Sequence, residues 1–421
     1  MPGIDQAARA VRLSSPLAPN ALALSRLEGG EELGRAFEYR LECVSEDPAI
    51  ELYELLGQPF GIELDVHDGG TRHLHGIVCS AAQIGRRSEY ALYALTLRPW
   101  LWLLTRTSDC RIFADLSVPD ILVAVFGDNG HDDYELRLSG TYDVWHHCVQ
   151  YRETDFDFVS RLMEHEGIYY FVEHMAGKHV VVLCDGPSAH DAMPGYEQVP
   201  HYAADERRER DHLIDWRFER HIQPGRCVVN DFAFDQPRRD LLVETTLTPT
   251  DAYPAFELYD YPGGYSNRDD GGLERAYGER LARLRAERLV AAHEIASAAG
   301  TAGGLAAGRL FELSNCDRED QNREYLIVLA RLKITMDSYF SDETSGAVEI
   351  RTGTDGRVIH GVGGSRSRRA PTGRRRERGD RESGRGVAPR ARATAPGGAT
   401  RAGEDPSGHR EGFGPRRAGA S

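Results

Sequence analysis

The chain has 421 residues, enough for two or three domains, and its 66 acidic and 51 basic residues give a formal net charge of −15. The segment 361–421 holds 15 Arg and 6 acidic residues, or +9, so residues 1–360 carry −24, which repels phosphate and argues against a nucleic-acid partner. The seven cysteines are scattered without a C-x-x-C pair, as expected for reduced thiols in a cytoplasmic protein. The sequence shows no signal-peptide pattern, and no apolar run reaches the roughly 20 residues needed for stable membrane insertion.

The first part of the chain predicts a β-rich unit. Residues 37–44 alternate strand-forming residues with charges, as a half-buried strand does. Residues 52–56 predict a short helical turn. Further strand patterns cover 62–66, 74–80 and 90–97, and such a series of short strands is typical of a barrel or sandwich. The dense apolar cluster at 99–104 indicates core or a subunit interface rather than a ligand platform.

The middle of the chain predicts a helix over 118–127 and then a strand, helix and hairpin over 148–183. Thr154 or Asp155 is placed to cap the second helix, and Gly167 to end it, because glycine adopts a left-handed conformation at little cost. Strand patterns follow at 168–172 and 179–183, joined by a short turn.

The following part predicts a second β unit with a long interruption. Residues 185–210 are polar and broken by prolines, which indicates a surface loop. Strands are predicted over 212–219 and 225–234, and a long helix over 273–295, where Ala, Leu, Arg and Glu recur. A hairpin is predicted from residues 305–313 and 324–335.

The segment 361–421 consists of Arg, Gly, Ala and Pro at 43 of its 61 positions and predicts a disordered tail. One interpretation is binding to RNA or membrane phosphates, although Phe413 is its only aromatic residue for base stacking. The interpretation we favour is a G/C-rich gene read out of frame, because these four amino acids have G/C-rich codons.

The segment YRETDFDFVSRLMEHEGIYYFVEH resembles the signature block of VgrG proteins, the spike-tip proteins of type VI secretion systems. Three more segments agree, in the family's order over residues 13–336: FEYRLECVSEDPAIELYELLGQPFGIEL, LTPTDAYPAFELYDYPGGY and DREDQNREYLIVLARLKI. The resemblance implies a mainly β fold with α insertions, built from tandem phage-tail-hub-like β-barrels. The implied domains are a first barrel (1–105), an inserted α+β subdomain with the helix and hairpin (106–210), a second barrel interrupted by a helix (211–345) and a disordered tail (346–421).

The resemblance also implies a structural function. Three chains with two barrels each would form a ring of six units seated on the six-membered Hcp ring, with effector or adaptor proteins as further partners. The protein would be cytoplasmic first and then secreted by sheath contraction. The family's neck and β-helix needle have no counterpart after Met336, apart from a faint similarity at 355–358, so a truncated chain is expected. The alternative is a hub fused to, or carrying, a hydrolytic effector that attacks cell wall or lipid.

Several residues could in principle supply a chemical site, but no catalytic, cofactor or metal residue is predicted from them. His146, His147 and Cys148 lack a second ligand cluster, and adjacent strand residues point to opposite sides. His73 and His75 would share one strand face without an evident third ligand. Two carboxylate pairs could suggest acid/base catalysis. Asp155 and Asp157 are better explained by helix capping, and Glu164 and Glu166 by a solvated helix end. Cys110 or Cys148 with a distant histidine stays open as a nucleophile.

Overall fold

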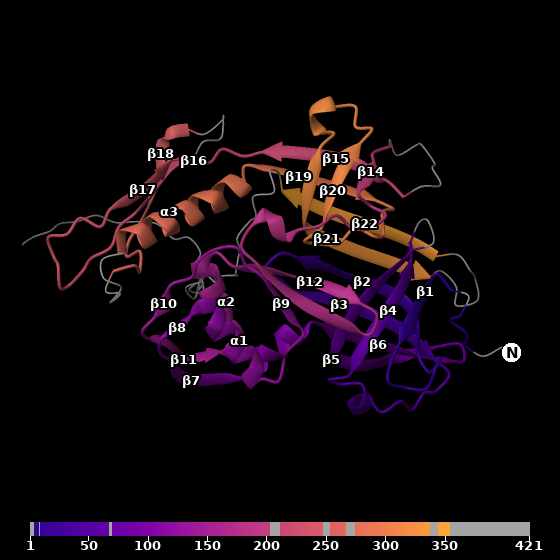
Figure 1. The fold of residues 1–421 in the computed structure, drawn as a ribbon. Coiled ribbons are helices and arrows are strands. Elements are labelled where there is room, and N and C mark those ends of the chain that lie inside the picture. Colours follow the sequence, from indigo (N-terminus) through magenta and orange to yellow (C-terminus); the bar gives the residue numbers. More distant parts are fainter. Residues whose placement is uncertain are drawn as a thin grey trace, which may run out of the picture. The chain divides into compact units, whose positions relative to one another are not determined.

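The computed structural model describes residues 4–7, 9–66, 70–202, 211–246, 253–266, 274–336 and 344–353 (Figure 1). The chain divides into two units, 1–365 and 366–421, and every described residue lies in the first. The predicted disordered segment 361–421 lies outside the described residues. The predicted boundary at 345/346 falls inside a strand, β22 (Thr344–Gly353).

The first β unit contains six antiparallel strands in the order β1-β4-β5-β6-β3-β2. Its strands are β1 (Val11–Ser14), β2 (Ala23–Glu32), β3 (Arg35–Ser45), β4 (Pro59–Asp65), β5 (Thr71–Arg87) and β6 (Tyr90–Arg98). No strand pair among the described residues joins β1 to β2, but the buried Gln6 side chain bridges the two ends of the unit: it accepts a hydrogen bond from Leu13 N (2.9 Å) and donates one to Leu22 O (3.0 Å). These strands confirm the pattern predicted for residues 37–97, and a 3₁₀ turn (Leu52–Glu54) lies at the predicted helical turn.

The second β unit also contains six strands, in the order β14-β20-β21-β22-β19-β15. They are β14 (Gln198–Pro200), β15 (Leu213–Arg220), β19 (Glu294–Gly300), β20 (Leu310–Ser314), β21 (Glu324–Met336) and β22. A bridge between His201 and Leu213 brings β14 back to β15 and closes this unit. Strands β2 and β21 pair antiparallel from Arg26–Thr335 to Glu32–Leu329, so both units share one 12-stranded sheet. Gly30 permits this close packing, since a Cβ there would lie 2.9 Å from Ala330 O of β21.

The segment between the first and the second β unit forms an α+β insertion (Figure 1). Its elements are η3 (Trp100–Arg106), β7 (Ser108–Phe113), β8 (Leu116–Ser117), α1 (Val118–Asp128), β9 (Tyr134–Arg137), β10 (Val144–Trp145), β11 (Cys148–Thr154), α2 (Asp155–Glu166), β12 (Tyr169–Met175) and β13 (Lys178–Cys184). The predicted helix boundaries at α2 are confirmed: Thr154 Oγ1 accepts from Asp157 N (3.0 Å), and Gly167 has φ of 75°. In the apolar cluster, Trp100, Leu101 and Leu104 are buried, which confirms their place in the core.

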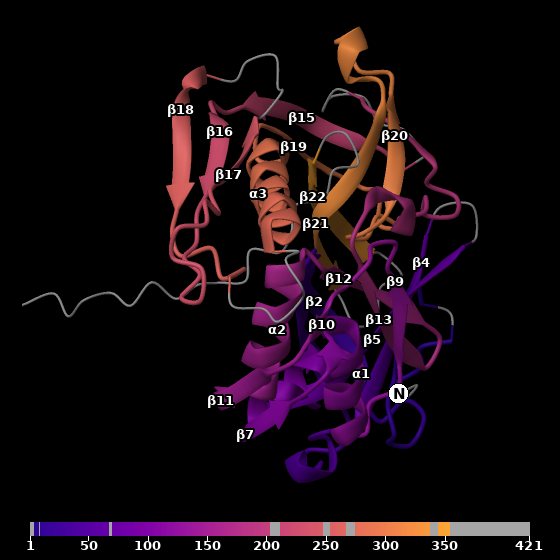
Figure 2. The same cartoon turned by 60° about the vertical axis from the view of Figure 1, so that its left-hand side comes forward.

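A second insertion lies between β15 and β19 (Figure 2). Helix α3 (Glu274–Ala291) packs against β16 (Pro224–Val229) and β17 (Val243–Thr246), and β18 (Tyr253–Asp260) forms the edge of that three-stranded sheet. The apolar core between them includes Cys227, Val229, Tyr265 and Leu281. None of the helices in the described residues is long and apolar enough to cross a membrane.

Three sequence predictions are corrected by the structure, and nonlocal strand pairing explains two of them. The stretch 185–202 is not only surface loop, because β14 pairs in parallel with β20 and Tyr196 and Val199 are buried. The long helix ends at Ala291 rather than 295, since Glu294–Gly300 forms β19 between β15 and β22. The strand predicted over 225–234 ends at Val229. Local residue preferences do not predict an alanine-rich strand, because distant partner strands stabilise it.

Candidate functional site

The residues that the sequence offered as possible metal ligands do not form a metal site. His146 Nδ1 lies 2.8 Å from Asp115 Oδ1, and both side chains are exposed, whereas Cys148 is buried in the core. His73 and His75 lie on β5, but only His75 is buried. Among the described residues, no group of three or more His, Cys, Asp or Glu side chains is arranged to hold a metal ion.

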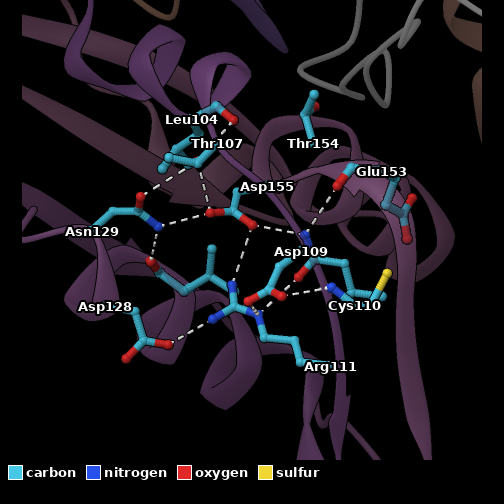
Figure 3. Close-up of polar contacts among 12 residues, drawn as sticks. Leu104, Thr107, Asp109, Cys110, Arg111, Asp128, Asn129, Glu153, Thr154 and Asp155 are labelled. Carbon is cyan, nitrogen blue, oxygen red and sulfur yellow. Dashed lines mark hydrogen bonds and ion pairs between the residues drawn. The ribbon is translucent and has the colours of Figure 1, made fainter.

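Asp155, at the start of α2, is the centre of a buried polar cluster (Figure 3). Its two oxygens accept hydrogen bonds from the side chains of Gln150 (2.7 Å), Thr107 (2.8 Å), Asn129 (3.0 Å) and Arg111 (3.3 Å). Burial opposes ionisation, but the hydrogen bonds from these side chains outweigh it and lower the pKa of Asp155. The carboxylate therefore fastens α2 to the end of η3, to α1, to β7 and to β11.

Asp155 and Asp157 do not form an acid/base pair. The Asp157 carboxylate accepts from Thr154 Oγ1 (2.8 Å) at the exposed helix end, while Asp155 is fully engaged in the buried cluster. The capping explanation thus holds for Asp157. Asp155 has a different role that sequence could not reveal, because its partners come from positions up to 48 residues away.

Glu166 links the two insertions. It is buried at the end of α2, accepts a hydrogen bond from Tyr277 Oη (2.6 Å) and pairs with Arg280 Nη1 (2.9 Å), both on α3. This corrects the expectation of a solvated helix end. Glu164 is partly exposed and lies 3.7 Å from Arg288, and burial raises the pKa of Glu164 despite that arginine.

Three histidines meet where β5, β12 and β13 cross. His75 Nδ1 and His179 Nδ1 lie 2.8 Å apart, and His179 Nε2 accepts from Trp100 N (2.9 Å). Neutral His179 must therefore carry its proton on Nδ1 and donate it to His75. The His75 backbone N–H donates to His174 Nδ1 (3.0 Å). Burial, together with the neighbouring charge of His174, lowers the pKa of His75 to about 4 and that of His179 to about 2.

A buried ion pair adjoins these histidines. Arg72 donates to Glu31 Oε1 (2.9 Å) and to the carbonyls of Gly303 and Leu305 (both 2.8 Å), while His174 Nε2 lies 3.5 Å from Glu31. Tyr39 also donates a short hydrogen bond to Glu31. Burial opposes ionisation of Glu31, but the charges of Arg72 and His174 hold its pKa at about 2. This cluster joins the first β unit, the insertion and a segment of the second unit.

Of the residues in this junction, sequence reasoning singled out only His75. Glu31, Arg72, His174 and His179 come from separate strands, and Arg72 binds carbonyls more than 230 residues away. The available signal was a set of charged and imidazole side chains inside apolar strand patterns. Such residues are rarely buried without partners, but the sequence does not show which partners they find.

Comparison with known proteins identifies relatives over most of the chain. Residues 30–338 match the family model described as phage tail baseplate hub (GPD). The Pseudomonas aeruginosa type VI secretion system spike proteins VgrG1b and VgrG1c are 48% and 46% identical over 344 and 352 residues. These alignments cover 82% and 83% of this chain but 45% and 48% of the relatives. The chain thus spans about half the length of the curated relatives it matches.

Solved structures agree on the fold. The Escherichia coli c3393 protein, described as a type VI secretion component similar to T4 tail proteins gp27 and gp5, superposes with a TM-score of 0.60 at 17% identity. That alignment covers 83% of this chain and 80% of the other. A tail protein from Neisseria meningitidis gives a TM-score of 0.56 at 12% identity, covering 82% and 97% of the two chains. At these identities the likeness establishes the hub fold alone.

Proposed function

Because the chain belongs to the phage tail baseplate hub family and matches VgrG spike proteins over about four fifths of its length, we propose that it is the hub part of a type VI secretion spike. In this role three copies form a ring that sits on the six-membered Hcp ring and leaves the cytoplasm when the sheath contracts. Effector or adaptor proteins would travel with it. The work would be done by the sheath, and the hub would contribute shape and rigidity.

The observation that carries this proposal is the pair of six-stranded units within one chain. The His201–Leu213 bridge closes the second unit, the Gln6 side chain bridges the ends of the first, and the β2–β21 pairing fixes one unit to the other through a continuous sheet. Three such chains present six similar units, so a three-fold spike can meet a six-fold ring without a symmetry mismatch.

We propose four domains near the predicted limits 1–105, 106–210, 211–345 and 346–421, adjusted so that β14 and β22, which pair within the second β unit, belong to the second barrel. The insertion would stiffen the hub, because Asp155 fixes its helices, His174 of the insertion lies 3.5 Å from Glu31 of the first β unit, and Arg72 joins that unit to Gly303 near the second. The relatives are spike proteins, which favours a structural rather than an enzymatic role. The alternative of a hydrolytic effector carried by the hub is an outcome that the experiment below distinguishes.

The test is to mix the purified full chain with Hcp from the same cells and to determine stoichiometry by native mass spectrometry. We expect three hub chains for each Hcp hexamer, and no binding to a six-membered ring protein of unrelated fold. A hub that stays monomeric, or that binds Hcp as six copies, would contradict the proposal. Release of sugar or lipid fragments from cell envelopes incubated with the chain alone would support the effector alternative.

A further inference from the structure

The two-stranded ribbon β7–β11 carries apolar side chains on its outer face, which is exposed to solvent. Ile112 stands opposite Val149 and Cys110 opposite Tyr151, so all four share one face. Ile112, Val149 and Tyr151 are 66%, 47% and 64% exposed. We call these four residues the ribbon face.

The inner side of the ribbon is already packed. A missing core therefore does not explain why the apolar side chains on the outer side are exposed. Gln150 is fully buried against Asp155, and the Phe113 ring stacks on Phe158 at 5.4 Å. An apolar outer face on a ribbon with a complete inner core indicates a surface that another molecule covers.

A second and different apolar surface lies on β18. Tyr259 and Tyr261 are 53% and 54% exposed, whereas Leu258, 42% exposed, points to the other side of the strand, beside the buried Cys227 of β16. Among the described strands β18 pairs with β16 alone, and its outer edge is open (Figure 2). We call these three residues the β18 edge. An open edge with aromatic side chains invites pairing with another chain.

We propose that the ribbon face of one copy docks on the β18 edge of the next copy in the ring. A two-fold dimer needs only one self-complementary patch, whereas a head-to-tail ring needs two unlike patches on each chain. The described residues provide two such unlike surfaces, the largely aliphatic ribbon face and the largely aromatic β18 edge. The inference rests on the proposed trimer and assigns the surfaces that hold it together.

Charge beside the two surfaces agrees with this pairing. Arg152 lies over the Tyr151 ring at 5.2 Å and forms no ion pair with another described residue. Beside the β18 edge, Arg226 is shared between Glu244 (3.2 Å) and Glu257, which leaves one carboxylate charge in excess. A cation next to the ribbon face would therefore meet a net negative charge next to the β18 edge. Such complementarity fixes register and direction.

The experiment uses two full-length variants and sedimentation velocity across a concentration series. The first is Ile112→Glu in the ribbon face, and the second is Leu258→Ser with Tyr259→Ser in the β18 edge. Because these side chains are exposed, both variants should keep wild-type thermal melts. Each should raise the concentration needed for trimer by about tenfold or more, as loss of a central contact does. The matched control is Ile84→Glu, 52% exposed on β5, which should assemble like wild type.

Mixing the two variants tests the direction of the contact. The intact ribbon face of one can meet the intact β18 edge of the other only once, so the mixture should form a heterodimer and neither variant alone a homodimer. Homodimers of either variant would overturn the head-to-tail arrangement. Wild-type trimer formation in both variants would overturn the assignment of surfaces and leave the proposed function standing. A wild-type chain that never forms trimers would refute the proposed function and this inference together.

Discussion

At the scale of single residues, substitution of Asp155 tests how much one buried carboxylate contributes to the stability of the insertion. In Asp155→Asn the amide keeps one acceptor oxygen and turns two N–H groups toward side chains that already donate, so at least two of the four hydrogen bonds are lost. We expect the free energy of unfolding in urea to fall by about 3 kcal/mol, as when one partner of a buried charged network is removed.

The matched control for this substitution is Asp157→Asn, two positions along the same helix. Asp157 is exposed, and its carboxylate accepts one hydrogen bond, from the capping residue Thr154, among the residues that the structure describes, so a loss of about 1 kcal/mol or less is expected. Equal losses in the two variants would show that charge near the helix start matters and that the buried cluster does not.

The histidine cluster predicts a pH dependence. In the unfolded chain each histidine has a pKa near 6.5, whereas the folded values are about 4 for His75 and about 2 for His179. Below pH 6.5 the unfolded chain therefore takes up protons that the folded chain does not. Stability is complete above pH 6.5 and falls with decreasing pH, by up to about 2 kcal/mol per histidine between pH 6.5 and 5.

Urea titrations at several pH values would measure this effect. In His179→Gln the fall in free energy of unfolding between pH 7.5 and 5 should be smaller than in wild type, since one lowered pKa is gone. A His179→Gln profile parallel to wild type would contradict the pKa explanation.

At the scale of elements, the sequence predicts a helix or strand correctly when residues near its ends determine it, and fails when a distant strand does. Helix α2 begins and ends where expected because Thr154 and Gly167 act on their own helix termini. Strand β14 was missed because its partner β20 lies more than a hundred residues further along the chain. The end of α3 was overestimated for the same reason, since pairing of β19 overrides the helical preference of alanine. The candidate site follows this rule: capping residues could be predicted, and the buried junctions could not.

The contact between α2 and α3 predicts a local change in stability. Glu166→Gln removes the charge that pairs with Arg280 inside the protein, so α3 should open more easily while the 12-stranded sheet stays protected. Hydrogen exchange followed by mass spectrometry should show protection in 274–291 falling by about tenfold or more. Glu164→Gln is the control, because Glu164 is partly exposed and pairs only loosely with Arg288. Unchanged exchange in α3 of Glu166→Gln would mean that apolar packing alone holds the helix.

At the scale of the whole molecule, net charge and interface charge oppose each other in assembly. Each chain carries a formal charge of −15, so three copies repel one another through their exposed acidic residues. The Arg152 contact proposed above acts in the opposite sense, but it is a single rim charge on each copy. Both effects are screened over about 8 Å at physiological ionic strength.

Because the repulsion sums over many charges and the attraction over few, we expect salt to favour the trimer. Between about 50 mM and about 500 mM salt, where screening shortens from over 10 Å to under 5 Å, the concentration at which half the chains are trimeric should fall several-fold. Sedimentation equilibrium at both salt concentrations measures this directly. Arg152→Gln removes the attractive charge, and with it the guanidinium over the Tyr151 ring, but keeps all four ribbon-face side chains, so its trimer should be weaker at low salt and close to wild type at high salt. If salt instead weakened the wild-type trimer and Arg152→Gln abolished that dependence, the interface ion pairs would dominate, and the net charge of the body would matter little for assembly.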